Sequence, residues 1–185
     1  MSDFPARQRF SLPQFTPWGG ANSPGVILGQ GNSLGTAALG DTGRAYAYPF
    51  RVYKELTVQS ISVLVVTPQT ANIDVGVYDA EGIRKCSNGG TALTVSSNVL
   101  QTFAMTTPTT LLPGLYYAVF VGSYSGANPT FVSNGAANSI AILGMSGGAA
   151  VEANKYPLPA TLTFAAFSGI QGIGIELIIS SRSVV

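Results

Sequence analysis

Turn-forming residues interrupt this sequence so often that only short structural elements fit between them. The chain has 22 glycines and 11 prolines among its 185 residues. Relative to alanine, proline destabilises a helix interior by about 3 kcal/mol and glycine by about 1 kcal/mol. No window of about 11 residues places its apolar side chains at the helical spacing. The sequence therefore favours short strands over helices.

Apolar and polar side chains alternate in several of the segments between the turns. Successive side chains of a strand point to opposite faces of its sheet, so this alternation predicts strands. The expected strands are residues 45–52, 56–66, 73–78, 95–105, 115–121, 130–132, 139–143, 162–167 and 172–180. Loops are expected at 106–110 and 144–151, and a turn at 79–82, where Gly82 can adopt a positive φ. Many short strands separated by turns predict an all-β sandwich or barrel.

Residues 1–43 differ from the rest because they keep no sustained period. They are rich in proline and glycine, yet they also carry Phe4, Phe10, Phe15 and Trp18. Disordered segments are usually poor in aromatic residues. We therefore expect two parts, an extended N-terminal arm over 1–43 and a β-sandwich domain over 44–185. The four aromatic side chains are the expected anchors of the arm on a partner; the alternative is a plain flexible tail with a first strand.

Charged residues make up only 9% of the chain, against roughly 25% in ordinary soluble domains. A free monomer normally carries a well-charged surface. The deficit therefore predicts either a surface covered by partner chains or one coated with hydroxyl and amide groups. The net charge is +1 and the cations are not clustered, so nucleic acid is not an expected partner. Residues 1–7 lack an apolar signal core, and no apolar run approaches the ~20 residues of a membrane helix. We therefore expect synthesis in a cytoplasm without membrane insertion.

The chain contains no histidine, which removes the commonest general base and the commonest transition-metal ligand. Among the acidic residues, only Asp74, Asp79 and Glu81 lie close together in the sequence. Asp79 and Glu81 occupy the expected turn, where aspartate is favoured by bonds to its own backbone. The alternatives are a weak calcium site at Asp79 and Glu81, or a carboxylate pair for glycoside hydrolysis. We expect no catalytic residues and no cofactor.

Cys86 is the single cysteine, so an internal disulfide cannot form. We expect a small structural residue beside a turn. Arg84 and Lys85 precede it, and their charges would act to lower the pKa of the thiol. Tyr116 and Phe120 are expected on one face of their strand and Tyr117 on the other. One of these faces would belong to the core, and the other would be exposed or in an interface.

Two segments resemble modules of known proteins. Residues 72–82 read NIDVGVYDAEG, and residues 111–119 read LLPGLYYAV. A strand ending in GVYDAEG, followed by one opening with LxPGLYYAV, is similar to the β-sandwich modules of virion proteins of tailed bacteriophages, including tail fibres and head fibres. The resemblance covers residues 44–125, less than half of the chain. It implies a jelly-roll-like sandwich that forms trimers and attaches to a virion.

These observations together predict a non-enzymatic structural protein of a tailed-phage virion. The chain lacks repeats and a long coiled coil, so a capsid-decorating, head-fibre or tail-attached protein fits better than the shaft of a fibre. Its expected partners are copies of itself, most simply as a homotrimer, and other capsid or tail proteins. The main alternative is a carbohydrate-binding module for receptor recognition, whose partner would be a host surface glycan. A polysaccharide depolymerase is the third hypothesis.

Overall fold

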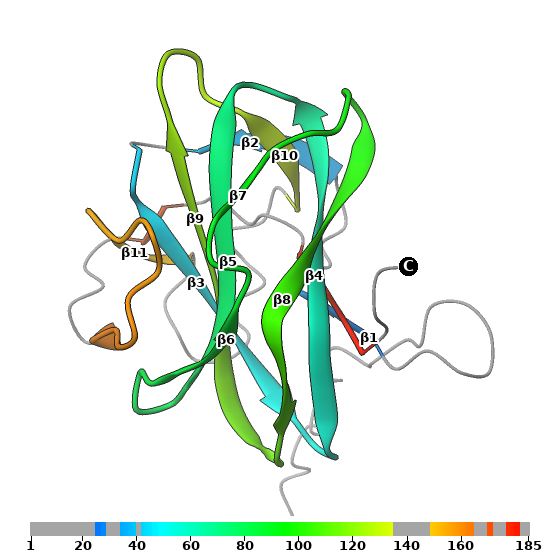
Figure 1. Ribbon diagram of the computed structural model, residues 1–185, viewed down its shortest axis with the longest axis vertical. Coiled ribbons are helices and arrows are strands. Elements are labelled where there is room, and N and C mark those ends of the chain that lie inside the picture. Colours follow the sequence, from blue (N-terminus) through cyan, green and yellow to red (C-terminus); the bar gives the residue numbers. More distant parts are fainter. Residues whose placement is uncertain are drawn as a thin grey trace, which may run out of the picture.

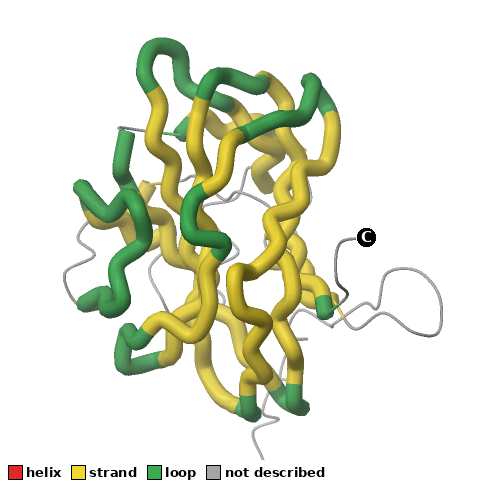
Figure 2. The backbone as a smooth tube through the Cα atoms, viewed as in Figure 1, coloured by secondary structure: helices red, strands yellow, loops and turns green. Residues whose placement is uncertain are grey.

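Two antiparallel β-sheets lie face to face in this protein, as Figure 1 shows for the computed structural model. The structure describes residues 25–28, 34–39, 42–134, 149–164, 170–171 and 177–181. Within these ranges all regular structure is strand, joined by loops (Figure 2). None of the described residues belongs to a helix long and apolar enough to cross a membrane. The predicted all-β sandwich is confirmed.

The first sheet has six strands, with the order β1-β13-β4-β10-β2 and with β8 on the other side of β4. Its strands are β1 Gly25–Leu28, β2 Leu34–Ala38, β4 Leu56–Thr67, β8 Val99–Leu111, β10 Thr130–Asn134 and β13 Leu177–Ser180. The second sheet has seven strands, with the order β12-β11-β3-β9-β5-β6 and with β7 beside β5. Its strands are β3 Ala45–Val52, β5 Ala71–Asp79, β6 Arg84–Ser87, β7 Thr91–Ala92, β9 Gly114–Tyr124, β11 Ala149–Glu152 and β12 Ile170–Gln171.

Successive strands repeatedly cross from one sheet to the other. The chain passes from β3 to β4, β5, β8, β9 and β10 in this manner, and all of the pairings are antiparallel. Crossing between sheets lets neighbouring strands of the sequence bury their apolar faces against one another. This connectivity agrees with the jelly-roll-like sandwich that the resemblance implies.

The main core lies between the sheets and is built from the alternate side chains of the central strands. Ile61, Val63 and Val65 of β4 are wholly buried, as are Ile73 and Val75 of β5. Burying such a side chain stabilises the fold by about 1.5–3 kcal/mol. The rings of Phe120 and Phe131 meet across the core, edge to face, with their centroids 5.1 Å apart. The alternating positions predicted from the sequence therefore form the core.

The N-terminal boundary expected at residue 43 needs correction. β1 pairs with β13 and β2 pairs with β10, so residues 25–28 and 34–38 belong to the six-stranded sheet. These strands have only four and five residues, too few to show an alternation. The four arm anchors Phe4, Phe10, Phe15 and Trp18 lie outside the described residues.

Other expectations about the strands also differ from the structure. Residues 149–151, part of the loop expected at 144–151, belong to β11, and the strand expected from residue 95 begins only at Val99. Residues 106–110 continue β8 instead of forming a loop. Pro108 fits because it lies in a register shift between β8 and β4, where its missing N–H breaks no ladder hydrogen bond. Residues 162–164 form no strand; Thr161 makes only an isolated bridge with Ile83. The strand expected at 139–143 lies outside the described residues.

Candidate functional site

Part of the outer face of the seven-stranded sheet is covered by residues 153–164, which we call the strap (Figure 1, orange). Leu158 and Leu162 of the strap are buried against Val119 and Val121 of β9. The ring of Phe164 stacks on Tyr117, with centroids 3.9 Å apart. The second face of β9 was expected to be exposed or in an interface. That expectation is wrong, because the chain's own strap covers it.

Side chains of the sheet hold the backbone of the strap. The Tyr78 hydroxyl, wholly buried on β5, donates a hydrogen bond to the Pro159 carbonyl over 2.6 Å. The Arg84 guanidinium donates to the Leu158 carbonyl, and the Arg84 backbone N–H donates to Ala160 over 2.9 Å. The polar backbone atoms that docking removes from water are thereby paired with groups of the sheet.

Backbone bonds fix the strap near both of its ends. The Lys155 N–H donates to the Gly43 carbonyl, and the Leu162 N–H donates to the Gly82 carbonyl, both over 2.8 Å. Gly82 has φ +82°, and a Cβ atom there would lie 1.9 Å from the Leu162 carbonyl oxygen. The positive φ predicted for Gly82 is confirmed, and the approach of the strap adds a second reason for glycine at this turn.

Asp74 lies beneath the strap and is wholly buried. Its Oδ2 accepts a hydrogen bond of 2.9 Å from the Leu158 N–H, while its Oδ1 has no hydrogen-bond partner among the described residues. Burial raises the pKa of this carboxyl; the Leu158 N–H and the Arg84 charge act in the opposite direction without cancelling it. Burial and the nearby Asp74 charge also raise the pKa of Tyr156.

The hydrogen bonds around Asp74 indicate that these side chains hold the strap in place rather than carry out catalysis. A catalytic acid must come within hydrogen-bonding reach of its substrate. The Asp74 carboxylate is inaccessible and already accepts a bond from the Leu158 amide. Its partners Tyr78 and Arg84 likewise bind carbonyl groups of the strap. The polar groups around Asp74 therefore hold the strap on the sheet.

The acidic pair singled out from the sequence lies at the end of β5. The Asp79 Oδ1 accepts a hydrogen bond from the Ile83 N–H over 2.8 Å, and its Oδ2 lies 2.6 Å from the Lys85 ammonium. Burial acts to raise the pKa of Asp79, but Lys85 and the Ile83 amide outweigh it and lower that pKa. Glu81 is exposed. The described residues contain no cluster of three acidic, cysteine or histidine side chains that could hold a metal.

Cys86 is buried in β6, where the core surrounds its thiol. Burial raises its pKa to about 11, although the Arg84 charge acts to lower it. The nearby positive charge does act to lower the pKa, as the sequence indicated, but the loss of hydration outweighs it. Cys86 is thus a protonated core residue at neutral pH.

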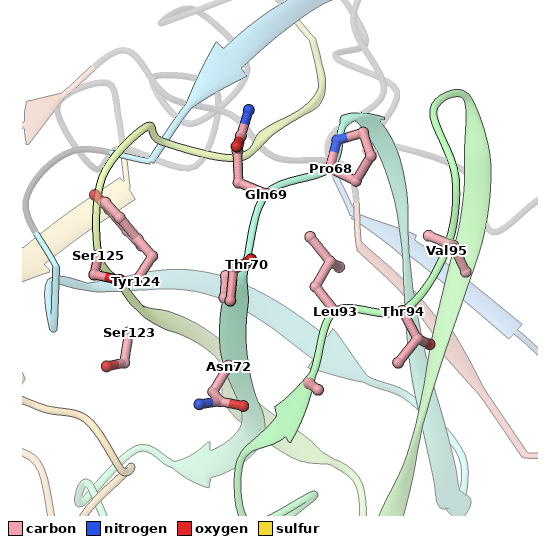
Figure 3. Close-up of a pocket in the computed structure, with 12 residues that line it drawn as sticks. Pro68, Gln69, Thr70, Asn72, Leu93, Thr94, Val95, Ser123, Tyr124 and Ser125 are labelled. Atoms are coloured by element: carbon pink, nitrogen blue, oxygen red, sulfur yellow. The ribbon is translucent and has the colours of Figure 1, made fainter.

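An open pocket of about 640 Å³ surrounds the first residues of β5, at one end of the sandwich. Figure 3 shows Thr70 and Asn72 in the middle, Leu93 and Val95 on one side and Ser123 on the other. None of the lining residues is charged. The pocket presents only hydroxyl, amide and apolar groups.

No family model matches this chain, and no curated protein matches it. Two solved structures are similar to it, both of infectious bursal disease virus. The structure of the Gx strain is 15% identical, and the match covers 89% of this chain and 36% of that chain, with a TM-score of 0.29. The VP2 subviral particle is 9% identical, with 89% and 37% covered and a TM-score of 0.29. The chain spans little more than a third of either structure's length, and similarity at this level establishes neither a shared fold nor a function.

Neither the strap nor the residues that hold it could be recognised from the pattern of the sequence. Asp74 alternates with Ile73 and Val75, so it resembled an ordinary solvent-facing position of a strand. Tyr78 gave a weak indication of a covering segment, because it places a large aromatic ring on the same face of the strand as Asp74. A face that carries both a carboxylate and an aromatic ring is better explained by a covering segment than by open solvent.

Proposed function

We propose that this protein is a non-enzymatic structural component of a virion, assembled through contacts between copies of itself. The observation that carries the proposal is the six-stranded sheet, none of whose strands contains an Asp, Glu, Lys or Arg. The seven-stranded sheet, in contrast, includes Arg51, Asp79 and Lys85. Among the described strands, the charged residues therefore all belong to the seven-stranded sheet.

The outer face of the six-stranded sheet carries small or aliphatic side chains. Since Ile61, Val63 and Phe103 point into the core, their neighbours point outward. We call these neighbours the neutral face: Ser60, Ser62, Leu64, Leu100, Thr102, Ala104 and Ile178. Leu100 and Ala104 are exposed, Leu64, Thr102 and Ile178 are half-buried, and Ser60 and Ser62 are buried. Ser62 and Thr102 pair their hydroxyl groups over 2.8 Å, and Leu100 is 46% exposed beside Leu64.

A second copy of this chain fits the neutral face better than a charged partner does. Charged groups of a partner would lose their hydration against this uncharged surface and would find no opposite charge there to compensate. A second neutral face has no such cost, and aliphatic side chains such as Leu64 and Leu100 would be buried by it. Closed symmetric assemblies are the usual outcome of contacts between identical chains. We propose a homotrimer, in which the neutral faces of three copies would meet around the threefold axis and different parts of each face would contact each neighbour.

The resemblance of residues 72–82 and 111–119 to tailed-phage modules supports the finer proposal of a capsid-decorating, head-fibre or tail-attached protein. Residues 1–24, with Phe4, Phe10, Phe15 and Trp18, would then contact other virion proteins. Aromatic side chains contribute about 1.5–3 kcal/mol each when buried, so the arm would also need backbone hydrogen bonds to become ordered.

Mass measurement in solution, together with electron microscopy of purified particles, tests the proposal. We expect a mass of three times 19.1 kDa at micromolar concentration. Ala104→Lys places a charge on the neutral face and should shift the protein to a monomer. Ala80→Lys adds the same charge to an exposed turn at the charged end of β5 and should leave the assembly intact. A wild-type monomer, or equal behaviour of the two variants, would contradict the proposal.

A further inference from the structure

We propose that the pocket at the start of β5 binds a neutral sugar unit of a surface glycan. This inference goes beyond the structural function, because it assigns a ligand to a surface separate from the neutral face. The pocket volume of about 640 Å³ lies within the usual range of small-molecule sites, ~300–1,000 Å³. The lining comes from the β4–β5 turn, the segment that follows β7 and the end of β9 (Figure 3).

Polar side chains in the pocket are available to a ligand. Gln69, Thr70, Asn72, Ser123 and Ser125 line it, and the side chains of all five make no hydrogen bond within the part of the chain that the structure describes. On the neutral face, by comparison, the outward hydroxyls of two strands bond to each other. Amide and hydroxyl groups can both donate and accept, as sugar hydroxyls do.

Apolar groups complete the match to a sugar. Pro68, Leu93 and Val95 lie on one side of the pocket in Figure 3, and the ring of Tyr124 lies on the other. A pyranose ring presents C–H groups on its faces and hydroxyl groups around its rim. A pocket with apolar walls and a few polar groups between them can therefore contact both parts of the ring.

The absence of charge in the lining narrows the class of ligand. A phosphate, carboxylate or ammonium group would lose hydration in the pocket without gaining a charged partner. An extended peptide would need an unpaired strand edge for its backbone. At Asn72, however, β5 is paired on both edges, with Ala92 of β7 and Ser123 of β9, and β7 itself offers an edge of only two residues. Neutral hexoses, deoxyhexoses and N-acetylhexosamines remain as the matching chemistry.

The test uses the full-length protein on a printed array of neutral and anionic glycans. We expect binding to a subset of the neutral glycans. Ala92→Trp fills the pocket with a large ring and should abolish this binding, while Asn72→Ala should weaken it by roughly fivefold to tenfold. Ala80→Trp places the same ring at an exposed alanine beyond the other end of β5 and should bind as the wild type does.

Three results would overturn the assignment: no binding to any neutral glycan, binding only to anionic glycans, or binding that Ala92→Trp leaves unchanged. The mass of each variant in solution is measured in parallel. Ala92→Trp should assemble normally, since Ala92 lies outside the neutral face. Loss of glycan binding with retained assembly therefore separates this inference from the proposed structural function.

Discussion

Replacing Tyr78 by phenylalanine tests whether the strap is held as its hydrogen bonds indicate. The ring would stay in place, including its edge-to-face contact with Phe164 at 6.3 Å, so only the hydroxyl is removed. That hydroxyl donates to the Pro159 carbonyl over 2.6 Å. A lost hydrogen bond of this kind costs about 0.5–1.5 kcal/mol. Because Pro159 is only half-buried, water can reach its carbonyl, and we expect a loss of about 1 kcal/mol.

Urea unfolding and amide hydrogen exchange together measure this effect. The Tyr78→Phe variant should lose about 1 kcal/mol of unfolding free energy, or about 2–4 °C in Tm. It should also exchange the Leu158 and Leu162 amides faster, because both are protected only while the strap is docked.

Tyr116→Phe is the matched control for this measurement. The Tyr116 hydroxyl donates to the Leu112 carbonyl over 2.9 Å, away from the strap. Its loss should cost a similar free energy while leaving exchange in the strap unchanged beyond the global effect. The interpretation that the Tyr78 hydroxyl holds the strap on the sheet would be refuted by either of two results. Tyr78→Phe could change neither the free energy of unfolding nor the amide exchange, or both variants could increase exchange in the strap equally.

Three further predictions concern buried groups of the sandwich. Burial raises the pKa of Asp74 in the folded protein above its value in the unfolded chain. Its stabilising contribution is therefore full below the unfolded pKa and is lost as the pH rises through the folded pKa. Over that pH window the free energy of unfolding of the wild type should fall relative to that of Asp74→Asn, and a constant difference between the two would contradict this. Cys86, with a pKa raised to about 11, should react with thiol reagents only as fast as the protein opens, and rapid native labelling would count against its burial. Gly82→Ala should destabilise by more than about 1 kcal/mol in urea unfolding, because its Cβ would strike the Leu162 carbonyl; an unchanged midpoint would argue against the close approach.

The main strands could be predicted from the sequence because their faces differ in polarity. β4 and β5 alternate apolar residues with Ser, Asn or Asp, and this pattern follows directly from the two-residue period of a strand. β1 and β2 are too short to show such a pattern, and neither contains a charged residue that would mark an outward face. Their positions depend on pairing with β13 and β10, distant in sequence.

The candidate sites were harder to predict, for a related reason. The acidic pair Asp79 and Glu81 is conspicuous in the sequence, but Asp79 is engaged locally by Ile83 and Lys85. The pocket, in contrast, combines Thr70, Leu93 and Ser123, which belong to three separate segments. Local patterns cannot show which loops meet at one end of a sandwich, so residues of this kind emerge only from the three-dimensional arrangement.

The pairing of β1 with β13 also determines the order of events during synthesis. Gly25–Leu28 is complete early, but its partner Leu177–Ser180 is among the last described residues to leave the ribosome. At about 5–20 residues per second, the first strand waits on the order of ten seconds for its neighbour. During this interval the edge of β1 that pairs with β13 lacks that partner. The six-stranded sheet can therefore be completed at β1 only late in synthesis.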